Sequence, residues 1–220
     1  GVLTAAAADE PQNLQIYVLL GQSNMAGRGQ LEKTREPLHP KILMLTREER
    51  WEPASEPLHF DKSIAGAGLG ASFALRMAAA EPQALIGLLP CAVGGTPLSR
   101  WQKGEDLYEQ AMKRIRTAQK AGVVRGVLWH QGENDQGADG PSGGFGHETY
   151  RSLFVNLSHA WAMDYPNSRM TYMFQIWPKS CAMGFDGSDN VLRDVQRSLP
   201  DSLDRVAIMS TLGIDPPGGC

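Results

Sequence analysis

Six short apolar runs, rich in β-branched and aliphatic residues, alternate with segments of helical periodicity along this chain. The apolar runs cover residues 14–20, 42–45, 84–89, 123–129, 170–176 and 205–209, and the helical patterns cover residues 69–80, 106–121, 147–163 and 190–199. Near-continuous apolar strands separated by helices are typical of a parallel sheet that is covered on both faces. We therefore expect an α/β fold: a doubly wound, flavodoxin-like parallel sheet of about five strands in a three-layer αβα arrangement.

Length and composition are those of one globular domain. The 220 residues are 42% hydrophobic and 20% charged, and one hydrophobic core suffices up to roughly 250 residues. We expect residues 14–220 to form a single domain that follows a flexible N-terminal segment, residues 1–13. The small residues at positions 4–9 are similar to the flank of a secretory cleavage site. We expect a secreted or periplasmic protein, with a cytoplasmic protein that carries a cloning scar as the alternative.

Several functional classes are disfavoured. Lys and Arg number 21 against 24 Asp and Glu, with neither sign clustered, so no nucleic-acid partner is expected. No apolar run approaches the roughly 20 residues of a membrane span. Cys91, Cys181 and Cys220 lack Cys-x-x-Cys spacing, and neither a metal nor a cofactor is expected. The glycines of residues 66–70 have the wrong spacing for a dinucleotide fingerprint. Composition leaves the oligomeric state open.

A serine stands directly after the first apolar run. Ligands of doubly wound sheets bind beyond the carboxyl ends of the strands, so the turns at residues 21–29, 90–101, 130–146 and 177–188 should face one crevice. Ser23 lies on the first of these turns, where its hydroxyl is exposed and can act as a nucleophile. The alternative is a serine that caps the following helix. Met25 occupies the place of the last glycine in Gly-x-Ser-x-Gly, so this is not an α/β-hydrolase elbow.

Three ordered blocks follow three of the expected strands: Gly21-Gln22-Ser23-Asn24-Met25-Ala26-Gly27, Gly94-Gly95-Thr96-Pro97-Leu98-Ser99-Arg100-Trp101 and Trp129-His130-Gln131-Gly132-Glu133-Asn134-Asp135. They resemble the blocks of SGNH hydrolases, in the branch of sialate O-acetylesterases and family 6 acetylxylan esterases. The resemblance runs from about Gln15 to the end of the chain. It implies a serine esterase that removes O-acetyl groups from an acetylated carbohydrate through an acyl-enzyme.

The resemblance also assigns roles to single residues. Ser23 would be the nucleophile, and the oxyanion donors would be the backbone N–H groups of Ser23 and Gly95 and the side-chain amide of Gln131. The alternatives are a simple tight turn at residues 94–95 and a Gln131 that braces its loop. The residues expected to contact substrate are Gln22, Asn24, Arg28, Thr96, Trp101 and Trp177. The two tryptophans could stack on a sugar ring, and Arg28 could receive a carboxylate.

The third block also contains two acidic residues and a histidine. Glu133 would orient the catalytic base, or it would bond to the turn of Ser23, and both readings stay open. Asp135 is expected to be a solvated loop acid. His130 should point away from Gln131, because successive residues of a strand alternate in direction, and we interpret it as a structural histidine.

The chain departs from the family pattern at its C-terminal end. The pattern has an Asp-x-x-His segment after the last strand, whereas this chain reads from Asp215 to Cys220 without a histidine. The resemblance therefore places the catalytic histidine beyond Cys220. His147 is a possible internal substitute, although it could equally begin a helix. The alternative function is an inactive, truncated or degenerate homologue that only binds an acylated glycan.

Overall fold

A computed structural model describes residues 11–31, 36–137, 146–165, 170–177 and 188–211. Its centre is a seven-stranded sheet with strand order β3-β2-β4-β1-β5-β6-β7. The strands are β1 (Leu14–Gly21), β2 (Ile42–Leu45), β3 (Trp51–Pro53), β4 (Leu85–Pro90), β5 (Gly122–His130), β6 (Met170–Phe174) and β7 (Val206–Met209). All neighbouring strands are parallel except β2 and β3, which form an antiparallel hairpin.

The doubly wound α/β fold is confirmed. Strands β4-β1-β5-β6-β7 have the flavodoxin-like order 2-1-3-4-5 when they are counted along the chain. The expected number of about five strands was too low, because β2 and β3 extend the sheet beyond β4. The sequence gives little signal for β3, since its three residues end in Pro53 and none of them is buried. A proline is compatible with such an edge strand, where a backbone N–H is not needed for pairing.

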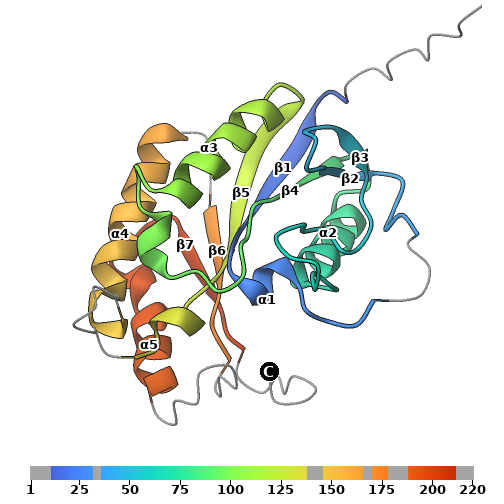
Figure 1. The fold of residues 1–220 in the computed structure, drawn as a ribbon. Helices are drawn as coiled ribbons and strands as arrows, with labels where there is room; N and C mark the ends of the chain where they lie inside the picture. The colour runs from blue at the N-terminus through green and yellow to red at the C-terminus, as the bar shows by residue number, and fades with distance from the viewer. Residues whose placement is uncertain (1–10, 32–35, 138–145, 166–169, 178–187, 212–220) are drawn as a thin grey trace, which may run out of the picture.

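Helices cover both faces of the sheet. The helices are α1 (Ser23–Ala26), α2 (Leu69–Ala80), α3 (Asp106–Ala118), α4 (His147–Asp164) and α5 (Ser188–Arg197), and short 3₁₀ turns occupy Leu98–Trp101, Glu133–Asp135 and Leu199–Asp201. Helices α3, α4 and α5 lie on one side of the sheet and α2 lies on the other (Figure 1). No helix within the described residues is both long enough and apolar enough to span a membrane.

Alternation along β1 divides the core between the two faces. Ile16, Val18 and Leu20 belong to the cluster that contains the buried residues of α3 and α4. Tyr17 and Leu19 belong to the second cluster, with the buried alanines of α2. Because β1 pairs with β4 on one side and β5 on the other, the carboxyl ends of these three strands lie side by side. The three motif blocks therefore begin at one edge of the sheet, as predicted.

Candidate active site

Ser23 begins the short helix α1, immediately beyond β1, and its side chain is partly exposed. The preceding Gly21 has φ 131°, and a Cβ there would lie 2.0 Å from the carbonyl oxygen of His130. Only glycine permits this close approach of two central strands. The backbone N–H of Gln22 donates to the same carbonyl at 3.0 Å. These contacts fix where the chain turns and therefore where the Ser23 hydroxyl lies.

A glycine-rich segment braces the far end of this turn. Gly29 and Ala67 exchange two backbone hydrogen bonds of 3.0 Å, and the N–H of Gly66 donates to the carbonyl of Gly27 at 3.0 Å. A Cβ on Gly27 would lie 2.4 Å from the Gly66 oxygen. The glycines of residues 66–70, whose spacing excludes a nucleotide fingerprint, thus allow two backbone segments to pack closely beside Ser23.

The second motif block lies next to the first. The N–H of Val93 donates to the carbonyl of Gly21 at 3.0 Å, which places the turn at residues 94–95 beside Ser23. Gly95 is exposed and has φ 79°, a left-handed conformation that favours glycine. Within the described residues, neither the N–H of Ser23 nor that of Gly95 donates to an internal acceptor. Two backbone donors thus lie free on neighbouring turns.

Gln131 does not match its predicted role as an oxyanion donor. Its side chain is fully buried, and its amide nitrogen donates to Thr96 O at 3.1 Å, to Gln22 Oε1 at 3.3 Å and to the Asp135 carboxylate. An amide nitrogen has two hydrogens, so none remains for a substrate oxygen. Gln131 braces the three motif blocks from beneath, which was the alternative considered for it.

Asp135 is buried, not solvated. It is fully inaccessible, and besides Gln131 its carboxylate accepts the backbone N–H of Leu98 at 3.1 and 3.3 Å. Gln22 is also buried and links the first block to the third, because its Oε1 accepts from the N–H groups of Gly132 and Asn134 at 3.4 Å. The predicted contact of Gln22 with substrate is therefore replaced by a structural role.

Glu133 bonds to the turn of Ser23, one of the two readings left open for it. Its Oε1 accepts from Asn24 Nδ2 at 2.5 Å and lies 3.2 Å from His130 Nε2. Burial alone would raise the pKa of Glu133, but the neighbouring His130 and the hydrogen bonds to the carboxylate hold it below its ordinary value. Glu133 is therefore a carboxylate that connects His130 with the residue directly after Ser23.

A crevice of about 540 Å³ opens beside these residues. Three of the residues expected to contact substrate line it, namely Asn24, Arg28 and Trp177. His130 also lies in its wall but is only 2% exposed, in agreement with the structural role predicted for it. The ring centroids of His130 and Trp177 lie 6.4 Å apart. The side chain of His130 points away from Gln131, as strand alternation predicted, and this orientation places it in the wall of the crevice.

Trp101 and Thr96 are in the core, so the predicted contacts with substrate are wrong for both. Trp101 is 1% exposed and packs edge-to-face against Trp129 at 5.5 Å between ring centroids. Its Nε1 donates to Thr96 Oγ1 at 3.3 Å, and that hydroxyl donates to the carbonyl of Val93 at 2.8 Å. Both side chains shape the turn at residues 94–95 from within.

Arg28 is held by an acid from another loop. Its Nη2 lies 2.8 Å from Asp61 Oδ2, and the same oxygen accepts the N–H of Gly94 at 2.8 Å. The guanidinium is thus engaged within the protein, so Arg28 is less free to receive a substrate carboxylate than its sequence position indicates. Asp61 carries no motif signal, and only the fold brings it to the turn at residues 94–95.

Asp61→Asn is expected to lower stability in a pH-dependent way. Burial acts to raise the pKa of Asp61, but the hydrogen bonds from Arg28 and Gly94 hold it below the ordinary value of an aspartate. A depressed folded pKa gives stability that is present above the unfolded pKa and is lost as pH falls through the folded one. We expect urea denaturation to show that the free energy of unfolding falls by about 1–3 kcal/mol at pH 7. This loss should become smaller below about pH 4.

The matched control is Asp106→Asn. Asp106 pairs with Arg100 at 2.5 Å, but both side chains are more than 40% exposed, and exposed pairs contribute little. A loss for Asp61→Asn that stayed constant from pH 7 to pH 3, or that equalled the loss for Asp106→Asn, would contradict the assigned role.

The other histidines lie apart from the crevice pocket. His147 begins α4, as its alternative reading proposed, and its Nδ1 lies 3.0 Å from the carbonyl oxygen of Gln136. His39 Nδ1 accepts the N–H of Lys41 at 3.1 Å. The expectations for residues 1–10, for Cys181 and for residues 212–220 fall outside the described residues. Within the described part of the chain, no cluster of three His, Cys, Asp or Glu residues could hold a metal ion.

Together, the doubly wound sheet and the position of the Ser23 turn at its carboxyl edge give this chain an SGNH-hydrolase-like fold. The family model for carbohydrate esterases described as sialic acid-specific acetylesterases matches residues 13–174. The chain belongs to this carbohydrate esterase family.

One related sequence and two solved structures show how similar this chain is to known proteins. A probable carbohydrate esterase of Arabidopsis thaliana is 39% identical over 165 residues, which cover 66% of this chain and 63% of that protein. The X-ray structure of that Arabidopsis protein superposes with a TM-score of 0.77 at 32% identity, covering 92% of this chain and 87% of that one. NanS has the same fold, with a TM-score of 0.72 at 17% identity and coverage of 96% and 83%.

Proposed function

We propose that this protein is a serine esterase that removes O-acetyl groups from carbohydrate. Membership of the carbohydrate esterase family supports the reaction class. The observation that carries the proposal is a partly exposed Ser23 directly after β1, whose own backbone N–H and the N–H of Gly95 on the neighbouring turn have no acceptor within the described residues. A nucleophile flanked by free, preorganised donors is what acyl transfer requires.

In the proposed reaction, Ser23 Oγ attacks the acetyl carbonyl carbon. The charge that develops on the carbonyl oxygen is stabilised by the N–H groups of Ser23 and Gly95. The sugar hydroxyl then leaves with a proton, and water hydrolyses the acetyl-enzyme to release acetate. A base must accept the Ser23 proton and return it to the leaving sugar oxygen, and the proposal assigns no described residue to that step.

The crevice pocket is the proposed place for the sugar that bears the ester. It offers Asn24 beside the nucleophile and the ring of Trp177 as an aromatic wall. Glu133 restrains the Asn24 amide through a hydrogen bond of 2.5 Å, which gives this polar contact a fixed direction. Aromatic faces with a few fixed polar groups are typical of small-ligand sites.

Acetate release from acetylated carbohydrate tests the proposal. We expect the purified protein to release acetate from acetylated xylo-oligosaccharide or from O-acetylated sialic acid, with turnover of roughly 1 to 10³ per second, as enzymes typically show. Enzyme-coupled detection of acetate provides the measurement, and heat-inactivated protein serves as the blank. Binding of either sugar without release of acetate would instead favour the homologue that only binds an acylated glycan.

A further inference from the structure

Two turns from different parts of the chain must keep a fixed relative position for the proposed reaction. Ser23 lies directly beyond β1, and Gly95 lies beyond β4. The oxyanion is stabilised only if the Gly95 N–H and the Ser23 hydroxyl meet at one carbonyl group, and a misplacement of about 1 Å can cost roughly 10²-fold in rate. Gly95 is exposed, and its N–H has no acceptor within the described residues. Neighbouring groups must therefore hold this turn in place.

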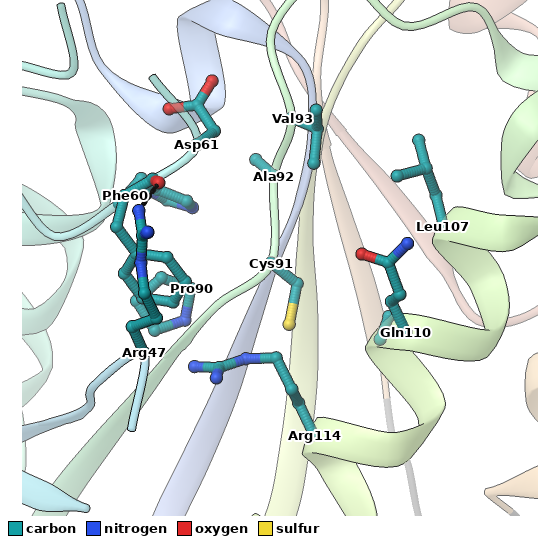
Figure 2. Close-up of a pocket in the computed structure, with 12 residues that line it drawn as sticks. Arg47, Phe60, Asp61, Pro90, Cys91, Ala92, Val93, Leu107, Gln110 and Arg114 are labelled. Atoms are coloured by element: carbon teal, nitrogen blue, oxygen red, sulfur yellow. Dashed lines mark hydrogen bonds between the residues drawn. The ribbon is translucent and has the colours of Figure 1, made fainter. Parts of the chain in front are cut away.

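Asp61 binds the Gly95 turn directly. It lies on the loop between β3 and α2, and Figure 2 shows it opposite the segment that carries Ala92 and Val93. Its Oδ2 accepts the N–H of Gly94 at 2.8 Å, and its side chain is only 1% exposed. The backbone N–H of Lys62 also bonds to this carboxylate. Asp61 is therefore too buried to contact a substrate, and its carboxylate is committed to the turn and to its own loop.

Arg28 joins Asp61 to the turn of the nucleophile. Its Nη2 donates to Asp61 Oδ2 at 2.8 Å, and its Nη1 donates to the carbonyl of Gly27 at 2.7 Å. The N–H of Gly27 in turn donates to the carbonyl of Ser23 at 2.9 Å. Hydrogen bonds thus connect the turn of Ser23 to Gly94 through one ion pair. Charge-assisted hydrogen bonds are stronger than neutral ones, which suits a rigid link between two turns.

Gly94 leaves room for this ion pair. A Cβ at Gly94 would lie 2.3 Å from Arg28 Nη2 and 3.1 Å from Asp61 Oδ2. A side chain there would therefore push the guanidinium away from the carboxylate. The φ angle of Gly94 is not positive, so alanine at this position would disturb the ion pair rather than strain the backbone.

We propose that Asp61 and Arg28 are positioning residues that hold the N–H of Gly95 in register with Ser23. Asp61 fixes the oxyanion turn through Gly94, and Arg28 ties the same carboxylate to the end of α1. Neither side chain needs to touch the reacting atoms for this role. The inference rests on the proposed function for the reaction that this geometry serves. Separating the ion pair should slow the chemical step rather than weaken the binding of substrate.

Asp61→Ala and Gly94→Ala test the role in different ways, because the first removes the carboxylate and the second keeps both charges but separates them. ¹⁵N relaxation gives the order parameter of the Gly95 N–H. We expect about 0.85 in the unmodified protein, as for rigid backbone, and less than about 0.6 in both variants. Turnover of acetylated xylo-oligosaccharide should fall by about tenfold or more, with KM within about twofold, because only the transition state uses the Gly95 N–H.

Asp106→Ala is the matched control, because Asp106 pairs with Arg100 on the exposed surface shortly after the same turn. Its Gly95 order parameter and its turnover should equal those of the unmodified protein. Asp61→Asn is the conservative variant, since its side-chain oxygen can still accept the N–H of Gly94. Both of its values should lie between those of Asp61→Ala and those of the unmodified protein.

The inference is overturned if the Gly95 N–H is already mobile in the unmodified protein. It is also overturned if Gly94→Ala leaves the order parameter unchanged or, in a protein that releases acetate, leaves the turnover unchanged. Gly94→Ala decides the question if Asp61→Ala does not fold, because it adds a single methyl group. Failure of the proposed function gives a different result: the Gly95 N–H becomes mobile in both variants, but even the unmodified protein releases no acetate.

Discussion

Replacement of Ser23 by alanine is expected to reduce acetylesterase turnover by about 10⁴- to 10⁶-fold, because the acyl-enzyme can no longer form. The small residual rate would come from the free N–H groups and from substrate binding. Ser23 is partly exposed, and its side chain makes no hydrogen bond to any of the described residues. The substitution should therefore leave the midpoint of urea denaturation nearly unchanged. Acetate release at saturating substrate measures the effect.

The control for this substitution is Ser72→Ala, which removes an exposed hydroxyl from α2. Its turnover should stay within about twofold of the unmodified protein, since surface changes away from a site are usually small in effect. If Ser23→Ala and Ser72→Ala hydrolysed the substrate equally fast, the serine mechanism would be wrong whatever the rate.

The second large effect is expected for stability and concerns Trp101. Trp101→Ala should lower the free energy of unfolding by about 3–5 kcal/mol, because it removes a fully packed indole and leaves a cavity beside Trp129. It also leaves the Thr96 hydroxyl without the indole N–H. Urea denaturation followed by circular dichroism measures the loss.

Trp177→Ala is the matched comparison, because Trp177 is partly exposed and lines the crevice. We expect a loss of stability below about 1.5 kcal/mol, as a partly exposed ring leaves no closed cavity, together with a higher KM for acetylated oligosaccharide. The assignment of the two tryptophans would be wrong if Trp101→Ala changed KM alone and Trp177→Ala carried the larger loss of stability.

Most of the fold could be predicted from the sequence because its periodicities are simple. Helix α2 spans Leu69–Ala80, as the pattern at residues 69–80 predicts, and the six apolar runs all form strands. Buried parallel strands require continuous apolar residues, so they are easy to recognise. Strand β3 was missed because an edge strand of three residues buries little and leaves no such pattern.

The site was predictable in location but less so in detail. Strand ends and motif blocks located Ser23, the turn at residues 94–95 and the Gln131 loop at one edge, and the structure brings them together. A motif cannot show which polar residues are buried, so Gln22, Thr96 and Asp135 were misplaced. Their burial depends on packing between all three blocks. Asp61 reaches the site from a loop with no motif, and only tertiary structure could identify it.

The meeting of Ser23 and Gly95 at one acyl oxygen is best tested by a crystal structure of the protein after reaction with a 4-nitrophenyl alkylphosphonate, which mimics the tetrahedral intermediate. We expect a covalent bond from phosphorus to Ser23 Oγ, with the phosphoryl oxygen about 2.7–3.1 Å from the backbone nitrogens of both Ser23 and Gly95. A phosphonyl group on another residue, or a phosphoryl oxygen directed away from Gly95, would contradict the proposed site.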